Sequence, residues 1–91
     1  MSYSLIFAPR AIEDFNRIKK SGDQARLKKL RSILEELQEH PLTGIGNPER
    51  LRYRADTYSR RLTGKDRIVY TVYNDIVEVN ILQMLGHYDD K

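Results

Sequence analysis

No cysteine occurs among the 91 residues. Neither a disulfide framework nor a thiolate metal site can therefore form, while the absence leaves the compartment open. Nowhere do about 18 apolar residues follow one another, and the N-terminal stretch MSYSLIFAP has no basic region before its short apolar run. We therefore expect a soluble, unexported protein that acts in the cytoplasm and has no membrane partner.

Motifs for metal and cofactor chemistry are missing as well. His40 and His87 are far apart, and the carboxylates form neither a tight cluster nor any other metal-ligand spacing. There is no Gly-x-Gly-x-x-Gly motif and no P-loop, and nothing supports a serine nucleophile. We therefore expect a site that uses no metal and no cofactor.

The positive charge is concentrated in one part of the chain. The formal net charge is only +3, but the stretch 50–67 contains seven basic and two acidic residues, so its net charge is +5 and the remainder carries −2. Lysine and arginine contacts with the backbone supply most nucleic-acid affinity, so such a patch suits phosphate binding. A solvated, charged pair of strands explains the same composition equally well.

The first half of the chain predicts a short strand and two helices. Alternating polarity over 2–8 indicates the strand, Pro9 favours a helix start, and the polar cluster 21–23 ends that helix and caps the next. Helical spacing is seen in the first helix at Ile12, Phe15 and Ile18, and in the second at Leu27, Leu30, Ile33, Leu34 and Leu37. Pro41 ends the second helix, and a glycine- and proline-rich surface loop follows.

The second half predicts strands whose registers can be derived from their turns. Strand-like segments lie at 50–53, 58–63, 67–73 and 76–84. A three-residue loop at 64–66 pairs Leu62 with Ile68. A two-residue turn after Tyr73 pairs Val72 with Val77, and the apolar side chains then share one face.

The same registers place Arg61 and Arg67 diagonally close on the opposite face. The length allows one compact core, so we expect a single domain, 1–91. The predicted fold class is α+β, with two N-terminal helices packed on one face of an antiparallel sheet and the arginines on the other.

Three residues can support RNA cleavage. That reaction needs a base for the 2′-hydroxyl proton, a cation for the phosphorane charge and an acid for the leaving 5′ oxygen, and Glu49, Arg67 and His87 can fill these roles. These residues can also have purely structural roles. A glutamate in a loop, such as Glu49, is usually only solvated. Tyr88 can stack on a base or pack on the sheet edge. Strand alternation favours Tyr88 over His87 on the arginine face, so a kink at Gly86 is required to bring His87 in.

Four motifs, taken in order, resemble a known family. They are PLTGIGNPERL at 41–51, YSRRLT at 58–63, DRIVY at 66–70 and HY at 87–88. Each is weak alone, but together they resemble the Txe/YoeB branch of the RelE-like toxins over almost the whole chain. The resemblance implies a type II toxin with a microbial RNase fold that cleaves mRNA in the ribosomal A site without a metal.

The resemblance also assigns roles to residues. Glu49 matches the family's general base, Arg67 its transition-state arginine, His87 its general acid, and Tyr88 the tyrosine that closes the site. Basic positions that hold substrate phosphates are matched by Arg52 and Arg61, and Lys65 in the basic stretch joins them as a nucleic-acid-binding candidate. The partners implied are a cognate antitoxin, the ribosome and mRNA, and a homodimer is left open.

The chain departs from the family pattern in two places. The stretch 54–57 is shorter than expected, and three residues, 89–91, extend past the usual terminal tyrosine. Their two aspartates favour a charged His87 imidazole.

Two other functions remain open at this point. RelE-like folds also include toxins that bind DNA gyrase and cut nothing, although the presence of a base, a cation and an acid together argues against that function. A non-catalytic RNA-binding module would need only the basic patch.

Overall fold

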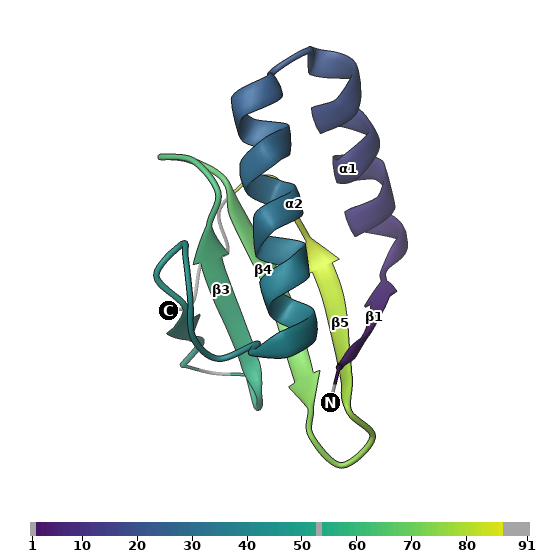
Figure 1. Cartoon of the computed structure of the whole chain (residues 1–91), viewed down its shortest axis with the longest axis vertical. Coiled ribbons are helices and arrows are strands. Elements are labelled where there is room, and N and C mark those ends of the chain that lie inside the picture. Colours follow the sequence, from purple (N-terminus) through teal and green to yellow (C-terminus); the bar gives the residue numbers. More distant parts are fainter. Residues whose placement is uncertain (1, 53, 87–91) are drawn as a thin grey trace.

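The structure is a computed structural model that describes residues 2–52 and 54–86. Its elements in chain order are β1 (Ser4–Phe7), α1 (Pro9–Ser21), α2 (Gln24–Glu39), β2 (Glu49–Arg50), β3 (Thr57–Arg61), β4 (Arg67–Tyr73) and β5 (Glu78–Gln83) (Figure 1). Within the described residues no helix is both long and apolar enough to cross a membrane.

Both helices begin and end where the local sequence predicts. Pro9 occupies the first turn of α1, where its missing N–H costs no helical hydrogen bond. Gly22 ends α1 with a φ of 76°, a conformation that glycine adopts without strain. Asp23 then caps α2 by accepting a hydrogen bond from the Arg26 N–H at 3.0 Å.

The buried faces of the helices agree only partly with the apolar spacing. In α2, Leu34 is half-buried, and the other predicted residues are buried, namely Leu27, Leu30, Ile33 and Leu37. In α1 the buried residues are Ala11, Asp14 and Ile18, while the Ile12 side chain is 50% exposed. The spacing therefore predicts the α1 helix and the inward positions of Ile18 and the half-buried Phe15, but it is wrong for Ile12 and misses Ala11 and Asp14.

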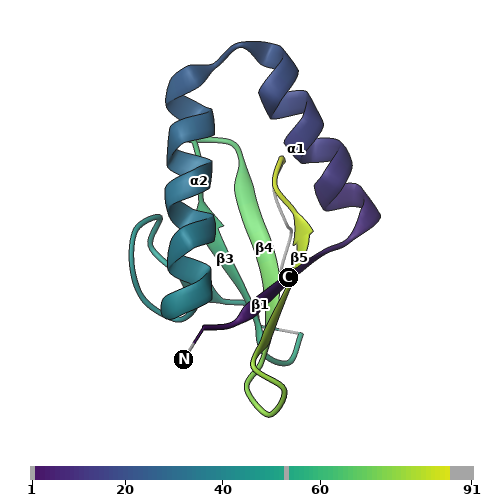
Figure 2. The same ribbon diagram turned by 45° about the vertical axis from the view of Figure 1, so that its right-hand side comes forward.

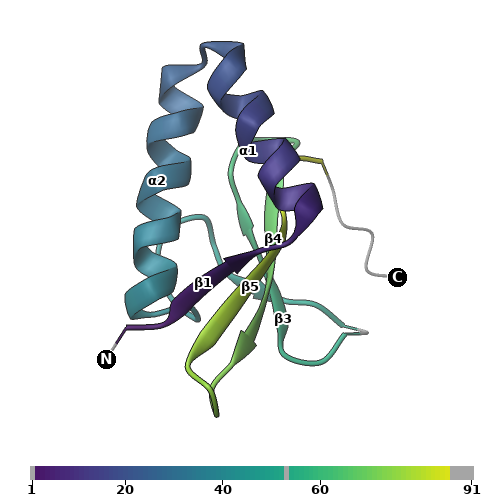
Figure 3. The same ribbon diagram turned by 90° about the vertical axis from the view of Figure 1, so that its right-hand side faces the viewer.

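The sheet has the order β1-β5-β4-β3-β2, with every pairing antiparallel except that of β1 with β5. Figures 2 and 3 show both helices on the same side of the sheet, with β1 along its edge next to β5. The α+β class and the helix-covered face are therefore confirmed, and the fully antiparallel sheet is corrected at one edge. Alternation in β1 reveals which side chains face inward but not the direction in which the strand runs.

The hairpin registers differ from the prediction by two residues. Arg60 pairs with Ile68 in place of Leu62, and Val72 pairs with Val79 in place of Val77. The loops are longer than expected, spanning 62–66 and 74–77, and Val77 adopts a φ of 53° inside the second. A shift of two keeps every side chain on its predicted face, so the core still contains Leu62, Ile68, Tyr70, Val72, Val79 and Ile81.

Candidate active site

The sheet face that points away from the helices carries Glu49, Arg61 and Arg67. Glu49 pairs with Ser59 across β2 and β3, and Arg61 pairs with Arg67 across β3 and β4. Paired residues share a face, as do residues two apart along a strand. Ser59 and Arg61 are two residues apart, so all of these side chains project to one side. Glu49 is offset from the arginine pair by about 7 Å along the strands, and it lies one strand across from Arg61 and two strands across from Arg67.

The two arginines lie directly opposite each other, closer than the diagonal arrangement that the sequence predicts. Arg61 is exposed and Arg67 is half-buried. Like charges opposite each other on adjacent strands repel, and a bound anion removes that repulsion. Two guanidinium groups on one face can hold a phosphate through several charge-assisted hydrogen bonds. This pair is therefore suited to a phosphate group.

Glu49 reaches this face through a short strand after the glycine-rich loop. The exposed Glu49 carboxylate accepts a hydrogen bond from the Asn47 side-chain amide at 3.2 Å. Asn47 itself has a φ of 50°, which asparagine tolerates better than most residues. The carboxylate thus lies at the sheet surface, in reach of water and of a substrate.

The predicted phosphate-binding residues lie at different points along this face. Lys65 is exposed in the loop that joins β3 to β4, next to the arginine pair. Arg52 is also exposed, but it follows β2 near the other end of β3, where the Leu51 N–H donates to the Thr57 carbonyl oxygen. Thr57 and Arg61 are four residues apart, about 13 Å in a strand, so Lys65 and Arg52 lie toward opposite ends of β3.

The C-terminal segment returns to Arg67 at its last described residue. The Arg67 N–H donates to the Gly86 carbonyl oxygen at 2.9 Å, and Gly86 has a φ of 82°. The backbone therefore turns at Gly86, where the sequence analysis expects a kink. His87 and Tyr88 themselves lie outside the described residues.

Two carboxylates that the sequence analysis missed hold this segment. Asp14, 1% exposed on α1, accepts hydrogen bonds from the N–H groups of Met84 at 3.0 Å and Leu85 at 3.2 Å. Asp66 accepts the Gly86 N–H at 3.0 Å. Three consecutive amides therefore end on aspartate side chains. An aspartate among the core-facing positions of a helix is the signal that could have revealed Asp14.

The pKa of Asp66 reflects these contacts. Partial burial raises it, but hydrogen bonds from the Gly86 N–H, the Thr63 hydroxyl and the Arg26 guanidinium outweigh that effect. The net result is a pKa below the ordinary value for an aspartate. Asp66 is therefore an ionised anchor at neutral pH.

Arg60 corrects the composition of the predicted basic patch. It lies in the stretch 50–67 beside Arg61, but its side chain is 0% exposed and points to the helix side of β3. Alternation with Leu62 could have shown this, since the two residues share the core-facing parity. The patch therefore holds one cation fewer than the sequence count.

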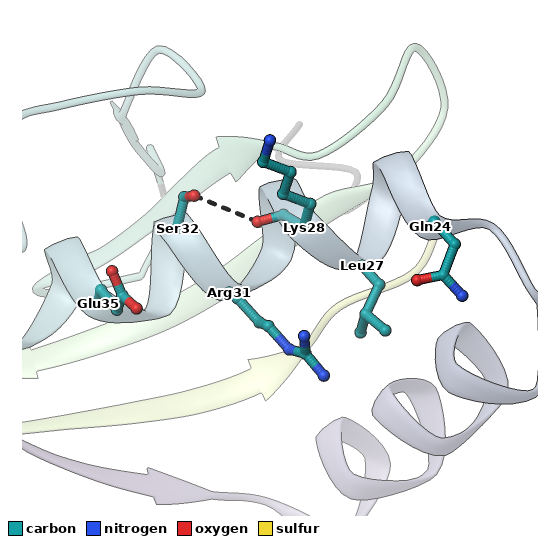
Figure 4. Close-up of a pocket in the computed structure, with 6 residues that line it drawn as sticks. All are labelled: Gln24, Leu27, Lys28, Arg31, Ser32 and Glu35. Atoms are coloured by element: carbon teal, nitrogen blue, oxygen red, sulfur yellow. Dashed lines mark hydrogen bonds between the residues drawn. The ribbon is translucent and has the colours of Figure 1, made fainter.

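A second basic region lies on the helical hairpin. The stretch 17–31 contains seven basic residues and one acidic residue. This local excess is hidden when the charge of all residues outside 50–67 is summed to −2. Figure 4 shows a hollow along α2 in this region, lined by Gln24, Leu27, Lys28, Arg31, Ser32 and Glu35. Because α2 covers the other face of the sheet, this hollow is separate from the Glu49 and arginine face. Charge counted in short windows would have found the region.

Comparisons with known proteins agree on one family. Residues 7–88 match the model of a family described as YoeB-like toxin of bacterial type II toxin–antitoxin system. Toxin YoeB of Mycobacterium bovis is 35% identical over 86 residues, which cover 93% of this chain and 98% of that protein.

Two solved structures from Staphylococcus aureus are similar over nearly the full length. One is the YoeB dimer, at 31% identity and a TM-score of 0.83, covering 97% of this chain and 100% of that chain. The other is a heterotetrameric YoeB–YefM toxin–antitoxin complex, at 31% identity and a TM-score of 0.78, with the same coverage of both chains.

Proposed function

Because this chain belongs to the family of YoeB-like toxins of bacterial type II toxin–antitoxin systems, we propose that it is an endoribonuclease that cleaves mRNA in the ribosomal A site and so stops translation. The observation that carries this proposal is the strand pairing that gathers Glu49, Arg61 and Arg67 on one face of the sheet. A carboxylate beside two guanidinium groups supplies a base and a phosphate-binding pair for RNA cleavage.

The proposed reaction proceeds through the 2′-hydroxyl group. Glu49 takes the 2′-hydroxyl proton, the 2′ oxygen forms a bond to phosphorus, and Arg67 stabilises the extra charge on the phosphorane. The bond from phosphorus to the 5′ oxygen then breaks, and His87 donates a proton to that oxygen. The products are a 2′,3′-cyclic phosphate and a free 5′-hydroxyl. Tyr88 closes the site over the substrate.

Phosphate binding is assigned to three further basic residues. Arg61 and Lys65 would hold the backbone beside the scissile phosphate, and Arg52 would hold it near the other end of β3. These contacts carry no base information. The ribosome would therefore supply the register of the codon, because a site with few base-reading groups cannot position one linkage by itself. Such an activity would take place in the cytoplasm.

Mapping of cleavage sites by primer extension tests this proposal. Purified toxin should cut mRNA on programmed ribosomes within the A-site codon and cut the same naked mRNA far more slowly, and Glu49→Gln serves as the matched inactive control. Equal cleavage of naked and ribosome-bound mRNA would refute the ribosome-dependent activity. Inhibition of gyrase without any cleavage would instead support the binding-only alternative.

We also propose that a cognate antitoxin covers the Glu49 and arginine face. The S. aureus relative was solved in complex with YefM, and exposed arginines attract acidic side chains. The affinity should fall as salt is added, whereas an affinity indifferent to salt would contradict this binding mode. A homodimer is proposed from the S. aureus YoeB dimer alone, and sedimentation of the free toxin tests it.

A further inference from the structure

The buried guanidinium of Arg60 is fully hydrogen-bonded. Its Nε donates to the Tyr70 hydroxyl at 3.1 Å, and its two terminal nitrogens donate to the Glu36 carboxylate at 2.6 Å and to three backbone carbonyl oxygens at 2.8–3.3 Å. Five N–H donors therefore have five acceptors. A buried charge is tolerated only with such complete pairing, because removal from water is costly.

The acceptors of Arg60 belong to the loop that follows α2. Its three carbonyl partners are those of His40, Thr43 and Ile45. The Tyr70 hydroxyl donates to the Pro41 carbonyl oxygen at 2.8 Å, and the Glu36 carboxylate accepts the Ile45 N–H at 2.9 Å. Five backbone groups of the loop 40–45 thus bind a single cluster, which we call the Arg60 node: the buried Arg60 and Tyr70 and the half-buried Glu36.

Two glycines allow the loop to approach this node. Gly44 has a φ of 128°, and a Cβ atom there would overlap the Glu36 carboxylate. Gly46 has a φ of 83°, and a Cβ atom there would lie 2.9 Å from the Arg61 carbonyl oxygen. The Gly46 carbonyl oxygen accepts the Arg61 N–H at 2.6 Å, so the loop is attached to β3 immediately after the node.

The attached loop leads directly to Glu49. Only Asn47 and Pro48 separate Gly46 from Glu49, and proline fixes one of the intervening φ angles. Arg60 also lies between Ser59, the strand partner of Glu49, and Arg61 of the phosphate-binding pair. Arg60 therefore fixes the loop that leads to Glu49 relative to β3, the strand that carries Arg61.

We infer that Arg60 is a positioning residue that, through the node, presents the Glu49 carboxylate to the arginine pair. This inference rests on the proposed role of Glu49 as the general base. A displacement of about 1 Å of a reacting group can slow a reaction by as much as roughly 100-fold, so loosening the loop should be measurable in the rate. If Arg60 only stabilised the fold, its replacement would lower the cleavage rate equally with and without Glu49.

A double-mutant cycle with Glu49 distinguishes these roles. Arg60→Lys keeps the charge but lacks the planar fork. Tyr70→Phe removes the one hydroxyl that joins Arg60 to the Pro41 carbonyl oxygen. Each should slow single-turnover cleavage on ribosomes by about 10-fold to 100-fold in the native background. In a Glu49→Ala background, each should change the cleavage rate by less than about twofold. The carboxylate that the node would position is absent there, so loosening the loop has no further effect on the rate. Ribosome affinity should stay the same.

The controls separate the possible outcomes. Tyr73→Phe removes an exposed hydroxyl from the same strand and should leave the rate unchanged. Circular dichroism melts show whether each variant is folded at the assay temperature, and Tyr70→Phe decides the outcome if Arg60→Lys does not fold. Equal slowing in both backgrounds, or no slowing in either, would overturn the positioning role. Native-like cleavage by Glu49→Ala would instead refute the proposed base, whatever the Arg60 variants do.

Discussion

Replacement of Asp14 by alanine should destabilise the fold strongly, because its buried carboxylate accepts hydrogen bonds from two backbone amides of the C-terminal segment. The change leaves the Met84 N–H, which is buried, and the Leu85 N–H, which is partly buried, without their acceptor. An unsatisfied buried N–H costs about 1–3 kcal/mol. Release of the carboxylate from its own burial offsets part of that loss. We therefore expect the free energy of unfolding to fall by roughly 2–4 kcal/mol.

Urea unfolding of Asp14→Ala and of a matched Glu13→Ala variant measures this loss. Glu13 is the exposed neighbour on the same helix, so its replacement should change the free energy of unfolding by less than about 0.5 kcal/mol. Hydrogen exchange should also accelerate at the Met84 and Leu85 amides in the Asp14 variant. A loss below about 0.5 kcal/mol, with unchanged exchange at those amides, would refute the reasoning.

Three other predictions follow from the site and its anchors. Glu49→Ala and His87→Ala should each slow single-turnover cleavage by roughly 100-fold or more while ribosome affinity persists, and Arg67→Lys should retain only part of the native rate. A rate equal to the native one for His87→Ala would move the acid role elsewhere. Arg61→Ala should weaken ribosome binding and lower its salt dependence by about one counterion, measured by titration at several salt concentrations. The lowered pKa of Asp66 adds stability that is fully present above the ordinary pKa of 3.8 and is lost as the pH falls through the folded-state pKa. Asp66→Asn should therefore have a lower free energy of unfolding than the native protein at pH 7, and unfolding curves should show this difference shrinking in acid. A difference in the free energy of unfolding that does not change with pH would contradict this role of the ionised Asp66.

The sequence predicts the order of the elements and the face of each strand, because both depend on local spacing. Helix ends follow from Pro9, Gly22 and Asp23, whose backbone preferences are local. Strand faces follow from alternation, which a register shift of two residues leaves intact. The registers themselves were predicted wrongly, because turn length depends on contacts such as the Asp66 carbonyl oxygen accepting both the Leu62 and Thr63 N–H groups.

The candidate site is predicted in part. The common face of Arg61 and Arg67 is confirmed, and the register adds Glu49 to it, while the roles of all three residues stay predictions. The burial of Arg60 escaped the charge count, because composition cannot distinguish a cation that binds substrate from one that binds a loop. Asp14 escaped for a similar reason, since its partners are backbone amides 70 and 71 residues away.

Buried polar side chains serve a specific purpose in a domain of this size. Glu49 follows a loop and His87 follows the last strand, so the segments that carry these groups must be held in place by contacts with the rest of the fold. Arg60 fixes the loop before Glu49 through backbone carbonyls, and Asp14 and Asp66 fix the segment before His87 through backbone amides. A guanidinium can satisfy several acceptors at once and a carboxylate several donors, so one side chain anchors a whole turn. An apolar residue would bury equally well but would leave those backbone groups unpaired, and the loop would lose its single conformation.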